Sequence, residues 1–223
     1  MFDRLEKLVG SFNLDKIKNT KVLVIGLGGV GGHTVLSLVR SGIEDITLVD
    51  YDVVDITNLN RQVVGFRKNI GKKKTNVLKE MIIDINPNCK VSILDLFLDS
   101  DNINSVIDNS FDYVVDACDT VKTKKAIIKT CLEKDIKIIS CMGTGNKFDP
   151  SKLEITDIRK TINDPLAKII RKFIKDEKIS KKLPVVSSSE LPLKVDGVIS
   201  SNSFVPGTAG LLITSYIIRD IIK

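Results

Sequence analysis

Short apolar runs alternate with amphipathic segments along the first 150 residues of the chain. Runs rich in β-branched residues predict five strands, at 22–25, 46–50, 91–96, 113–116 and 137–140. Segments of helical periodicity between them predict helices, at 30–40, 74–85, 104–107 and 124–134. Alternation of this kind produces right-handed crossovers and a parallel sheet with helices on both faces. The pattern therefore predicts an α/β fold with a Rossmann-like, doubly wound, mostly parallel sheet.

The pattern changes after Pro150. Isolated strands, which extend the sheet in an antiparallel manner, are predicted at 153–158, 185–188 and 199–204. Helices are predicted at 165–174 and 207–222, and the Lys-rich stretch near 175–182 predicts a loop. A chain of 223 residues can bury one full core, so we expect a single domain over 1–223 with halves at 1–150 and 151–223.

The apolar stretches are interrupted well before the roughly 18 to 20 residues that a membrane span requires. The first segment, MFDRLEKLVGSF, mixes charged and apolar residues at helical spacing, which is not typical of a signal peptide. We therefore expect no membrane association and a cytoplasmic location. The four cysteines form no CxxC pair and His33 is the single histidine, so a structural zinc site is not expected.

The chain is basic: 34 Lys and Arg against 28 Asp and Glu give a net charge of +6. This excess admits a polyanionic partner such as nucleic acid, and it is equally compatible with an ordinary solvated surface. Cations on the helix predicted after Pro165 recur at three- and four-residue spacing and include Arg171 and Lys172. If RNA is a partner, we expect this stripe to contact it.

A glycine-rich loop follows the first predicted strand. Gly26, Gly28 and Gly31 have GxGxxG spacing, with Gly29 between them, and Asp50 ends the second strand. Backbone N–H groups at the start of a helix can hold phosphate, and an acid at that strand end can accept hydrogen bonds from ribose hydroxyls. The loop predicts a nucleotide but does not distinguish a dinucleotide cofactor from ATP.

Cations in the following segment favour ATP. LVDYDVVDITNLNRQ carries Asp52, Asn58, Arg61 and Gln62, and GKKK ends in Lys74. Hydride transfer develops little charge on cofactor phosphates, whereas displacement at phosphorus requires neighbouring cations. Gln62 is either a nucleotide contact or a turn cap.

These motifs, together with DACDT, resemble the ATP-dependent adenylating family of ubiquitin-activating-type, molybdopterin-synthase and thiamine sulfur-carrier enzymes, the ThiF-like family. The resemblance implies that 1–150 binds the nucleotide and that 151–223 serves substrate binding and dimerisation. It also implies ATP and Mg²⁺ as cofactors. Asp50 would hold the ribose, and Asp119, the second acid of DACDT, would hold Mg²⁺ or orient the phosphates. The triphosphate would contact Asn58, Arg61 and Lys74.

Three further segments, FDRLEKLVG, SCMGTGNKFDP and DIRKTINDPLA, are similar to the tRNA threonylcarbamoyladenosine dehydratase branch of that family. This branch dehydrates the modified adenosine through a carboxyl-adenylate. The resemblance implies that Asn146 and Lys147 face the substrate. It also implies a homodimer in which Arg4 enters the partner's ATP site, and it admits sulfur-transfer protein partners.

Two other functions remain alternatives. The chain is either a dehydratase, an adenylyltransferase for a ubiquitin-like sulfur carrier, or a regulatory nucleotide-binding module without turnover. The missing CxxC pairs and the GNK and DPLA motifs count against the second. Retention of Arg61, Lys74 and Asp119 counts against the third.

Overall fold

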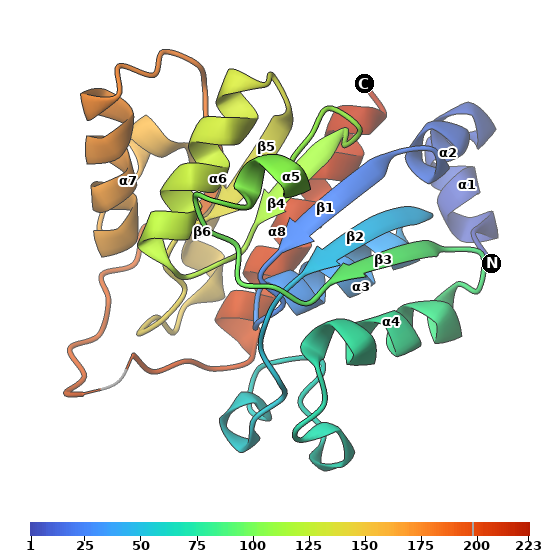
Figure 1. Ribbon diagram of the computed structural model, residues 1–223, viewed down its shortest axis with the longest axis horizontal. Helices are drawn as coiled ribbons and strands as arrows, with labels where there is room; N and C mark the ends of the chain where they lie inside the picture. The colour runs from blue at the N-terminus through green and yellow to red at the C-terminus, as the bar shows by residue number, and fades with distance from the viewer. Residues whose placement is uncertain (198) are drawn as a thin grey trace.

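The computed structural model describes residues 1–197 and 199–223. Its described strands form one seven-stranded sheet in the order β3-β2-β1-β4-β5-β7-β6 (Figure 1). The strands are β1 (Lys21–Ile25), β2 (Asp45–Val49), β3 (Lys90–Leu94), β4 (Tyr113–Asp116), β5 (Lys137–Cys141), β6 (Leu153–Asp157) and β7 (Pro184–Ser188). All neighbours run parallel except β6 and β7, which are antiparallel.

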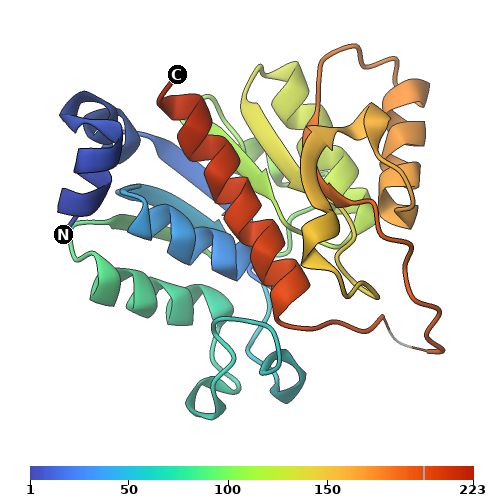
Figure 2. The ribbon, with the colours of Figure 1, turned by 180° about the vertical axis from the view of Figure 1, so that it is seen from behind.

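Helices cover both faces of this sheet. One face carries α3 (Gly31–Arg40), α4 (Lys74–Ile85) and α8 (Phe204–Ile221), as the rear view shows (Figure 2). The other carries α5 (Ile103–Val106), α6 (Val121–Glu133) and α7 (Pro165–Asp176). Two helices precede the sheet, α1 (Asp3–Val9) and α2 (Ser11–Lys18). Short 3-10 helices are η1 (Ile56–Asn58), η2 (Arg67–Asn69), η3 (Pro150–Lys152) and η4 (Ile158–Lys160).

The central strand β1 explains why both faces must be covered. Val22 and Val24 pack into the core under α3, α4 and α8, whereas Leu23 and Ile25 pack into the core under α5, α6 and α7. All four are at most 2% exposed. A strand buried on both sides has a continuous apolar sequence rather than an alternating one, as parallel sheets require. The predicted doubly wound α/β fold is thus confirmed.

One predicted strand is wrong. The segment 199–204 pairs with no described strand, and Phe204 already begins α8. The backbone of Ser200 is instead hydrogen-bonded to Asn146, through both its N–H and its carbonyl group. Asn202 then accepts the N–H of Val205, 2.9 Å away, and so satisfies a donor in the first turn of α8.

The remaining differences concern the ends of helices. The helix α7 continues to Asp176, so the predicted Lys-rich loop begins two residues later. Gly10, with φ of +84°, separates α1 from α2 in a stretch for which the sequence indicated helical spacing without this break. Among the described helices, none is long and apolar enough to cross a membrane.

Candidate functional site

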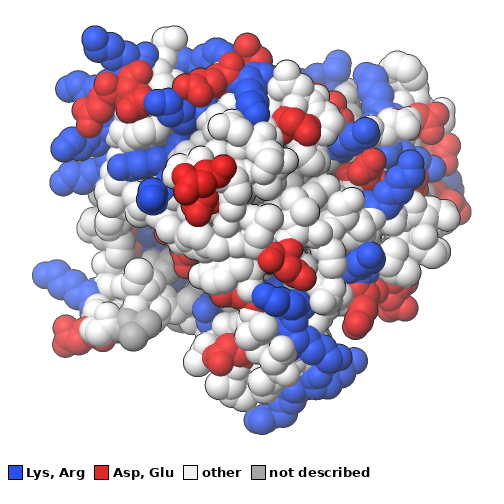
Figure 3. Space-filling view, in the orientation of Figure 1, with Lys and Arg blue, Asp and Glu red and all other residues white. Residues whose placement is uncertain are grey.

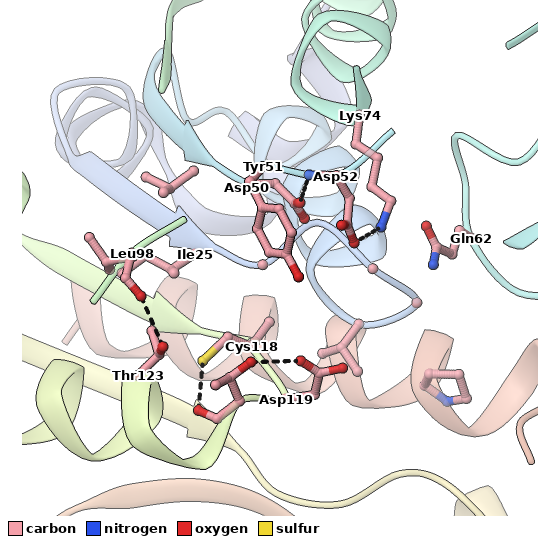
Figure 4. Close-up of a pocket in the computed structure, with 18 of the residues that line it drawn as sticks. Ile25, Asp50, Tyr51, Asp52, Gln62, Lys74, Leu98, Cys118, Asp119 and Thr123 are labelled. Carbon is pink, nitrogen blue, oxygen red and sulfur yellow. Dashed lines mark hydrogen bonds and ion pairs between the residues drawn. The ribbon is translucent and has the colours of Figure 1, made fainter. Parts of the chain in front are cut away.

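A cavity of about 340 Å³ opens at the carboxyl ends of β1, β2 and β4. After β1 the chain continues to β2, which lies on one side of β1 in the sheet, whereas β4 lies on the other side of β1. The strands β1 and β4 therefore flank the point at which the strand order reverses. Parallel sheets bind ligands at this point because the loops after the two strands diverge there. Figure 4 shows the acidic and basic side chains that face the cavity.

The glycine loop forms one wall of the cavity. A Cβ atom on Gly31 would lie 1.8 Å from the carbonyl oxygen of Gly26, so this tight turn excludes any larger residue. Gly28 differs, because its Cβ would approach nothing closer than Gln62 Nε2 at 3.9 Å. Gly26, Gly28 and Gly29 line the cavity, and Gly31 begins α3 behind them. The absence of a side chain at Gly28 therefore leaves room for a ligand at the helix N-terminus.

Asp50 connects the glycine loop to the end of β2 through hydrogen bonds. Its Oδ2 accepts the N–H of Leu27 at 2.6 Å and its Oδ1 accepts the N–H of Asp52 at 2.8 Å. The side chain lines the cavity although the residue is only 9% exposed. Each carboxylate oxygen has a second lone pair, so Asp50 can also accept a hydrogen bond from a ligand hydroxyl.

Lys74 brings a buried cation to the same cavity. Its ammonium lies 2.8 Å from Asp52 Oδ2, and its side chain is 6% exposed against 46% for Asp52 (Figure 4). Lys74 is the first residue of α4, which fixes where its side chain starts. The partner of the Lys74 ammonium is thus a carboxylate that is more exposed than the lysine itself. An anionic ligand in this cavity can share the ammonium with Asp52 or take the place of Asp52.

Arg61 supplies a second cation, held by η1. Asp55 accepts the N–H of Thr57 at 2.8 Å, and the Asn58 amide oxygen accepts the N–H of Asp55 at 3.1 Å. Arg61 Nη1 donates to the carbonyl oxygen of Thr57 at 2.8 Å and to Asn60 Oδ1 at 2.9 Å. Among the described residues no carboxylate pairs with Arg61. Its charge at the cavity is therefore not neutralised by the protein.

Gln62 lies beside the glycine loop with an unsatisfied acceptor. It is 8% exposed, and its Oε1 has no hydrogen-bond partner among the described residues. A buried acceptor without a donor costs on the order of 1–3 kcal/mol. A cap would have satisfied this atom, so the geometry favours a ligand contact over the alternative role as a turn cap.

The two acids of DACDT have different surroundings. Asp116, at the end of β4, is fully buried and accepts hydrogen bonds from Lys124 Nζ at 2.7 Å and from Ser140 Oγ at 2.6 Å. Asp119 is exposed and lines the cavity (Figure 4). Asp116 is therefore structural, whereas Asp119 is available to a ligand or a metal ion. Sequence reasoning did not identify Lys124, because a cation is not expected among the apolar positions of a helix.

Cys118, between these acids, lines the cavity as a thiol. Burial raises its pKa well above the ordinary range, and the neighbouring Asp116 carboxylate raises it further. The thiolate, not the thiol, is the reactive form of cysteine. The raised pKa therefore keeps Cys118 in its less reactive thiol form.

Two residues predicted to face the substrate support the cavity wall instead. Lys147 is 3% exposed, and its ammonium contacts Gly143 O at 2.9 Å and Asp164 Oδ2 at 3.0 Å. Asn146 accepts the N–H of Ser200 at 2.7 Å. Their neighbours Thr144 and Ser201 do line the cavity. Asn146 and Lys147 were predicted to contact the substrate. In the structure, both side chains form hydrogen bonds within the protein and connect neighbouring loops.

The other predicted residues lie away from the cavity. Arg4 is exposed on α1, and this helix lies near the amino end of β1 (Figure 1). Arg171 turns back from α7 and donates to the backbone oxygen of Thr161 at 2.8 Å and to its hydroxyl. Lys172 is exposed. Within one protomer, none of the three reaches the cavity.

Sequence reasoning missed an aromatic pair at this site, Tyr51 and Phe97, although both follow strands at their carboxyl ends. Tyr51 stands between the two predicted acids, Asp50 and Asp52. Both residues come shortly after the end of a strand, and this position could have indicated that they lie at the ligand site.

A doubly wound sheet with a glycine loop, two cations and an acid around one cavity defines a nucleotide-binding α/β protein. The sequence model of the ThiF family matches residues 2–164, and the chain belongs to this family.

Two curated relatives and one solved structure are similar over most of the chain. The tRNA threonylcarbamoyladenosine dehydratase of Bacillus subtilis is 39% identical, over 100% of this chain and 94% of the relative. That of Escherichia coli is 37% identical, over 92% of this chain and 74% of the relative. A crystal structure of the E. coli dehydratase in complex with ATP superposes with a TM-score of 0.94 at 34% identity, over 99% and 93% of the two chains. The resemblance to this branch, predicted from the sequence, is confirmed.

Proposed function

We propose that this chain is an ATP-dependent tRNA threonylcarbamoyladenosine dehydratase. One observation carries the proposal: a single cavity holds the glycine loop, the unneutralised Arg61, the buried Lys74 and the accessible Asp119. The similar E. coli structure was solved in complex with ATP, which supports ATP as the nucleotide. The names of the relatives supply the substrate, because the cavity alone does not define the acid that is activated.

In the proposed reaction, the side-chain carboxylate of the modified adenosine attacks the α-phosphorus of ATP. The bond from that phosphorus to the bridging oxygen breaks and pyrophosphate leaves, which produces a carboxyl-adenylate. A nucleophile within the same side chain then attacks the acyl carbon, AMP departs with one carboxylate oxygen, and a ring closes. The net change is the loss of one water from the substrate.

This chain's residues position the reactants and neutralise charge. Arg61 and Lys74 offset the negative charge on the phosphates and the departing pyrophosphate, which is the main requirement of phosphoryl displacement. Gly28 leaves space for the phosphates at the start of α3, and Asp50 accepts a ribose hydroxyl. Gln62 offers its unpaired Oε1 to a donor on the ligand.

Mg²⁺ fits this donor set as a companion of the nucleotide. The described residues contain no cluster of three or more candidate ligands, and Asp119 is an exposed carboxylate that lines the cavity. Mg²⁺ typically uses one or two carboxylates together with substrate phosphates, rather than a complete protein cage. When bound, the ion neutralises phosphate charge, and Asp119 would hold it.

The proposal extends to assembly. We infer a cytoplasmic homodimer in which Arg4 completes the partner's site, because the resemblance to the dehydratase branch implies this arrangement and Arg4 does not line the cavity of its own protomer. Within each protomer, 1–150 would bind ATP and 151–223 would contact substrate and partner, in one domain. Lys172, exposed on α7, remains the predicted RNA contact on that helix, and sulfur-transfer proteins remain predicted partners.

The test is mass spectrometry of nucleosides from tRNA carrying threonylcarbamoyladenosine, incubated with this protein, ATP and Mg²⁺. We expect the modified nucleoside to lose the mass of one water while AMP accumulates in equal amount. Arg61→Ala protein is the control for contaminating activity. An unchanged nucleoside, with AMP formed only when a sulfur-carrier protein is added, would refute the proposal and favour the adenylyltransferase alternative.

A further inference from the structure

The excess positive charge of the chain lies in one segment. Residues 59–79 contain seven of the 34 Lys and Arg residues and none of the 28 Asp and Glu residues. The rest of the chain therefore carries 27 Lys and Arg against 28 Asp and Glu, a net charge of −1. Charge concentrated in this way attracts a polyanion to one part of the surface, whereas evenly spread charge serves solubility alone.

Most of these cations lie outside the nucleotide cavity. Two of the seven line the cavity, and four others are exposed away from it, Arg67, Lys68, Lys72 and Lys79. Among the described residues, none of the four pairs with a carboxylate. The stretch 65–73, called the basic arm below, projects at the bottom of Figure 1, and its basic surface appears at the bottom of Figure 3.

Hydrogen bonds hold the basic arm against the body of the protein. Gly71 donates its N–H to Val54 O at 2.8 Å, and Val54 donates its own N–H to Lys72 O, also at 2.8 Å. The Asn69 side chain, in a residue that is 5% exposed, donates to the carbonyl oxygen of the buried Val64 at 3.0 Å. The cations are thus presented from a fixed backbone. A ligand that binds them does not have to order the arm first.

A groove of about 920 Å³ lies between the basic arm and α4. Lys72, Lys73 and Lys79 line it together with two acids, Glu80 and Asp84. Both acids follow the lysines in sequence, so they lie toward the end of α4 that points away from the nucleotide cavity. The end of the groove that borders the arm is therefore basic, and it is the end nearer to the cavity.

The position of the arm favours RNA among polyanions. Arg61 comes before the arm, Lys74 follows it, and both line the nucleotide cavity. A chain of phosphates bound along the arm therefore leads to the mouth of that cavity. An RNA strand carries one negative charge at every nucleotide, which suits several unpaired cations on one projecting element. Contacts of this kind fix the register of a nucleic acid on a protein without reading its sequence.

We propose that the basic arm, together with Lys79, binds the sugar–phosphate backbone of the RNA substrate. Arg67, Lys68 and Lys72 contact phosphates, and the bound strand places the modified nucleoside at the mouth of the nucleotide cavity. This inference rests on the proposed function, because it takes tRNA as the substrate.

The test removes three charges of the arm, as Arg67→Gln with Lys68→Gln and Lys72→Gln. Affinity for a hairpin RNA that carries an anticodon stem and loop is measured by fluorescence anisotropy at several salt concentrations. Each phosphate contact contributes about 0.7–0.9 to the slope of log K against log salt concentration, so we expect the slope to decrease by about 2–3. ATP affinity, measured by calorimetry, should keep its wild-type value because none of the three residues lines the cavity. An unchanged slope would overturn the proposal.

The matched control removes one Arg and two Lys from the opposite edge of the sheet, as Arg40→Gln with Lys21→Gln and Lys90→Gln. Arg40 ends α3, whereas Lys21 and Lys90 begin β1 and β3. All three are exposed, and in the described part of the chain none pairs with a carboxylate. Net charge changes by the same amount in both variants, but we expect the control to keep the wild-type slope. Equal decreases in the two variants would show that net charge alone attracts RNA, and the arm would have no special role.

Poly-glutamate is the probe for an acidic protein partner. We expect it to bind wild-type protein more weakly than a hairpin of equal charge does. If poly-glutamate binds as tightly as the hairpin and loses as much affinity when the arm is changed, the arm is a site for acidic proteins and the proposal is wrong.

The arm and the proposed reaction fail in different ways. If wild-type protein does not dehydrate the nucleoside while the slope still depends on the arm, the proposed reaction is wrong and the arm remains an RNA-binding surface. If dehydration occurs but the arm variant binds the hairpin as wild type does, the arm is wrong and the reaction stands.

Discussion

Replacing Lys124 by Met should destabilise the protein strongly, although Lys124 never meets solvent or ligand. Its ammonium lies 2.7 Å from Asp116 Oδ2, and both side chains are 0% exposed. It also donates to the carbonyl oxygen of Cys141 at 3.0 Å and to Ser140 Oγ at 3.3 Å. Burial lowers the pKa of Lys124, but the adjacent Asp116 more than offsets this, and the net direction is upward. The lysine is therefore charged, and Lys124→Met leaves Asp116 without its counter-ion.

The size of the effect follows from that unpaired charge. Breaking a buried pair by removing one partner costs ~3–5 kcal/mol. For a chain of 150–250 residues each kcal/mol lowers Tm by about 2–4 °C, so we expect a decrease of about 6–20 °C. Thermal unfolding followed by circular dichroism measures it. AMP formation should fall as well, because Asp116 Oδ1 accepts the N–H of Cys118 at 3.3 Å in the loop that carries Asp119.

The same helix provides a matched control. Lys129 pairs with Glu177 Oε2, also at 2.7 Å, but these side chains are 45% and 40% exposed. An exposed pair is worth at most about 1 kcal/mol, so Lys129→Met should barely change Tm. The double variant Asp116→Asn with Lys124→Met removes both charges and should lose less stability than the sum of its single changes. Equal Tm values for Lys124→Met and Lys129→Met, or strict additivity in the double variant, would refute this account.

Three further predictions concern the site, the assembly and pH. Arg61→Ala and Lys74→Ala should each lower the rate of AMP formation by about 10²- to 10⁵-fold, measured by single turnover, with an unchanged circular dichroism spectrum; wild-type rates would exclude them from the site. Mixed Arg4→Ala and Arg61→Ala proteins should regain activity after subunit exchange, because one site of each hybrid dimer then has both arginines; an inactive mixture with proven exchange argues against a shared site. The Lys137 and Tyr113 hydrogen bonds lower the pKa of Asp220 to about 2. This contribution to stability is present above the unfolded-state pKa of about 3.9 and is lost as pH falls through the folded value. The Tm difference between wild type and Asp220→Asn should therefore shrink between about pH 4 and pH 2, and a constant difference would contradict the pKa.

Most of the fold could be predicted because its signals are local. Buried parallel strands such as β1 and β4 are short, continuous apolar runs, and each ends at a polar residue or a glycine. The nucleotide cavity followed from the same signals, since a glycine loop and an acid at neighbouring strand ends converge wherever the sheet is parallel. Gly26, Asp50, Lys74 and Asp119 were predicted and all line one cavity.

The part of the chain after β5 was harder to predict because polar side chains, not apolar periodicity, determine its path. The segment 199–204 was predicted as a strand, but it is apolar only at Ile199 and Phe204, and Asn146 forms hydrogen bonds with the backbone of Ser200. Lys147 is a cation in a glycine-rich turn, a position that suggests an exposed side chain in contact with substrate. In the structure Lys147 is buried, because it pairs with the buried Asp164. Arg171 likewise bonds to Thr161, 10 residues away in sequence. Such partners are identified only when tertiary structure brings them together.

The cysteines point to a reaction without a protein nucleophile. Burial is the largest cause that raises the pKa of Cys141 to about 12, and it has the same effect on Cys131. Cys118, the thiol at the cavity, has its pKa raised further, so none of these three is a thiolate near neutral pH. A carboxyl-adenylate formed in this cavity therefore faces Cys118 as a thiol rather than as a nucleophilic thiolate. An internal attack needs none, because a nucleophile in the same side chain reaches effective concentrations of about 10⁵–10⁸ M when it is held in line. On this reasoning the residues at the cavity contribute through geometry and charge, and the substrate supplies its own nucleophile.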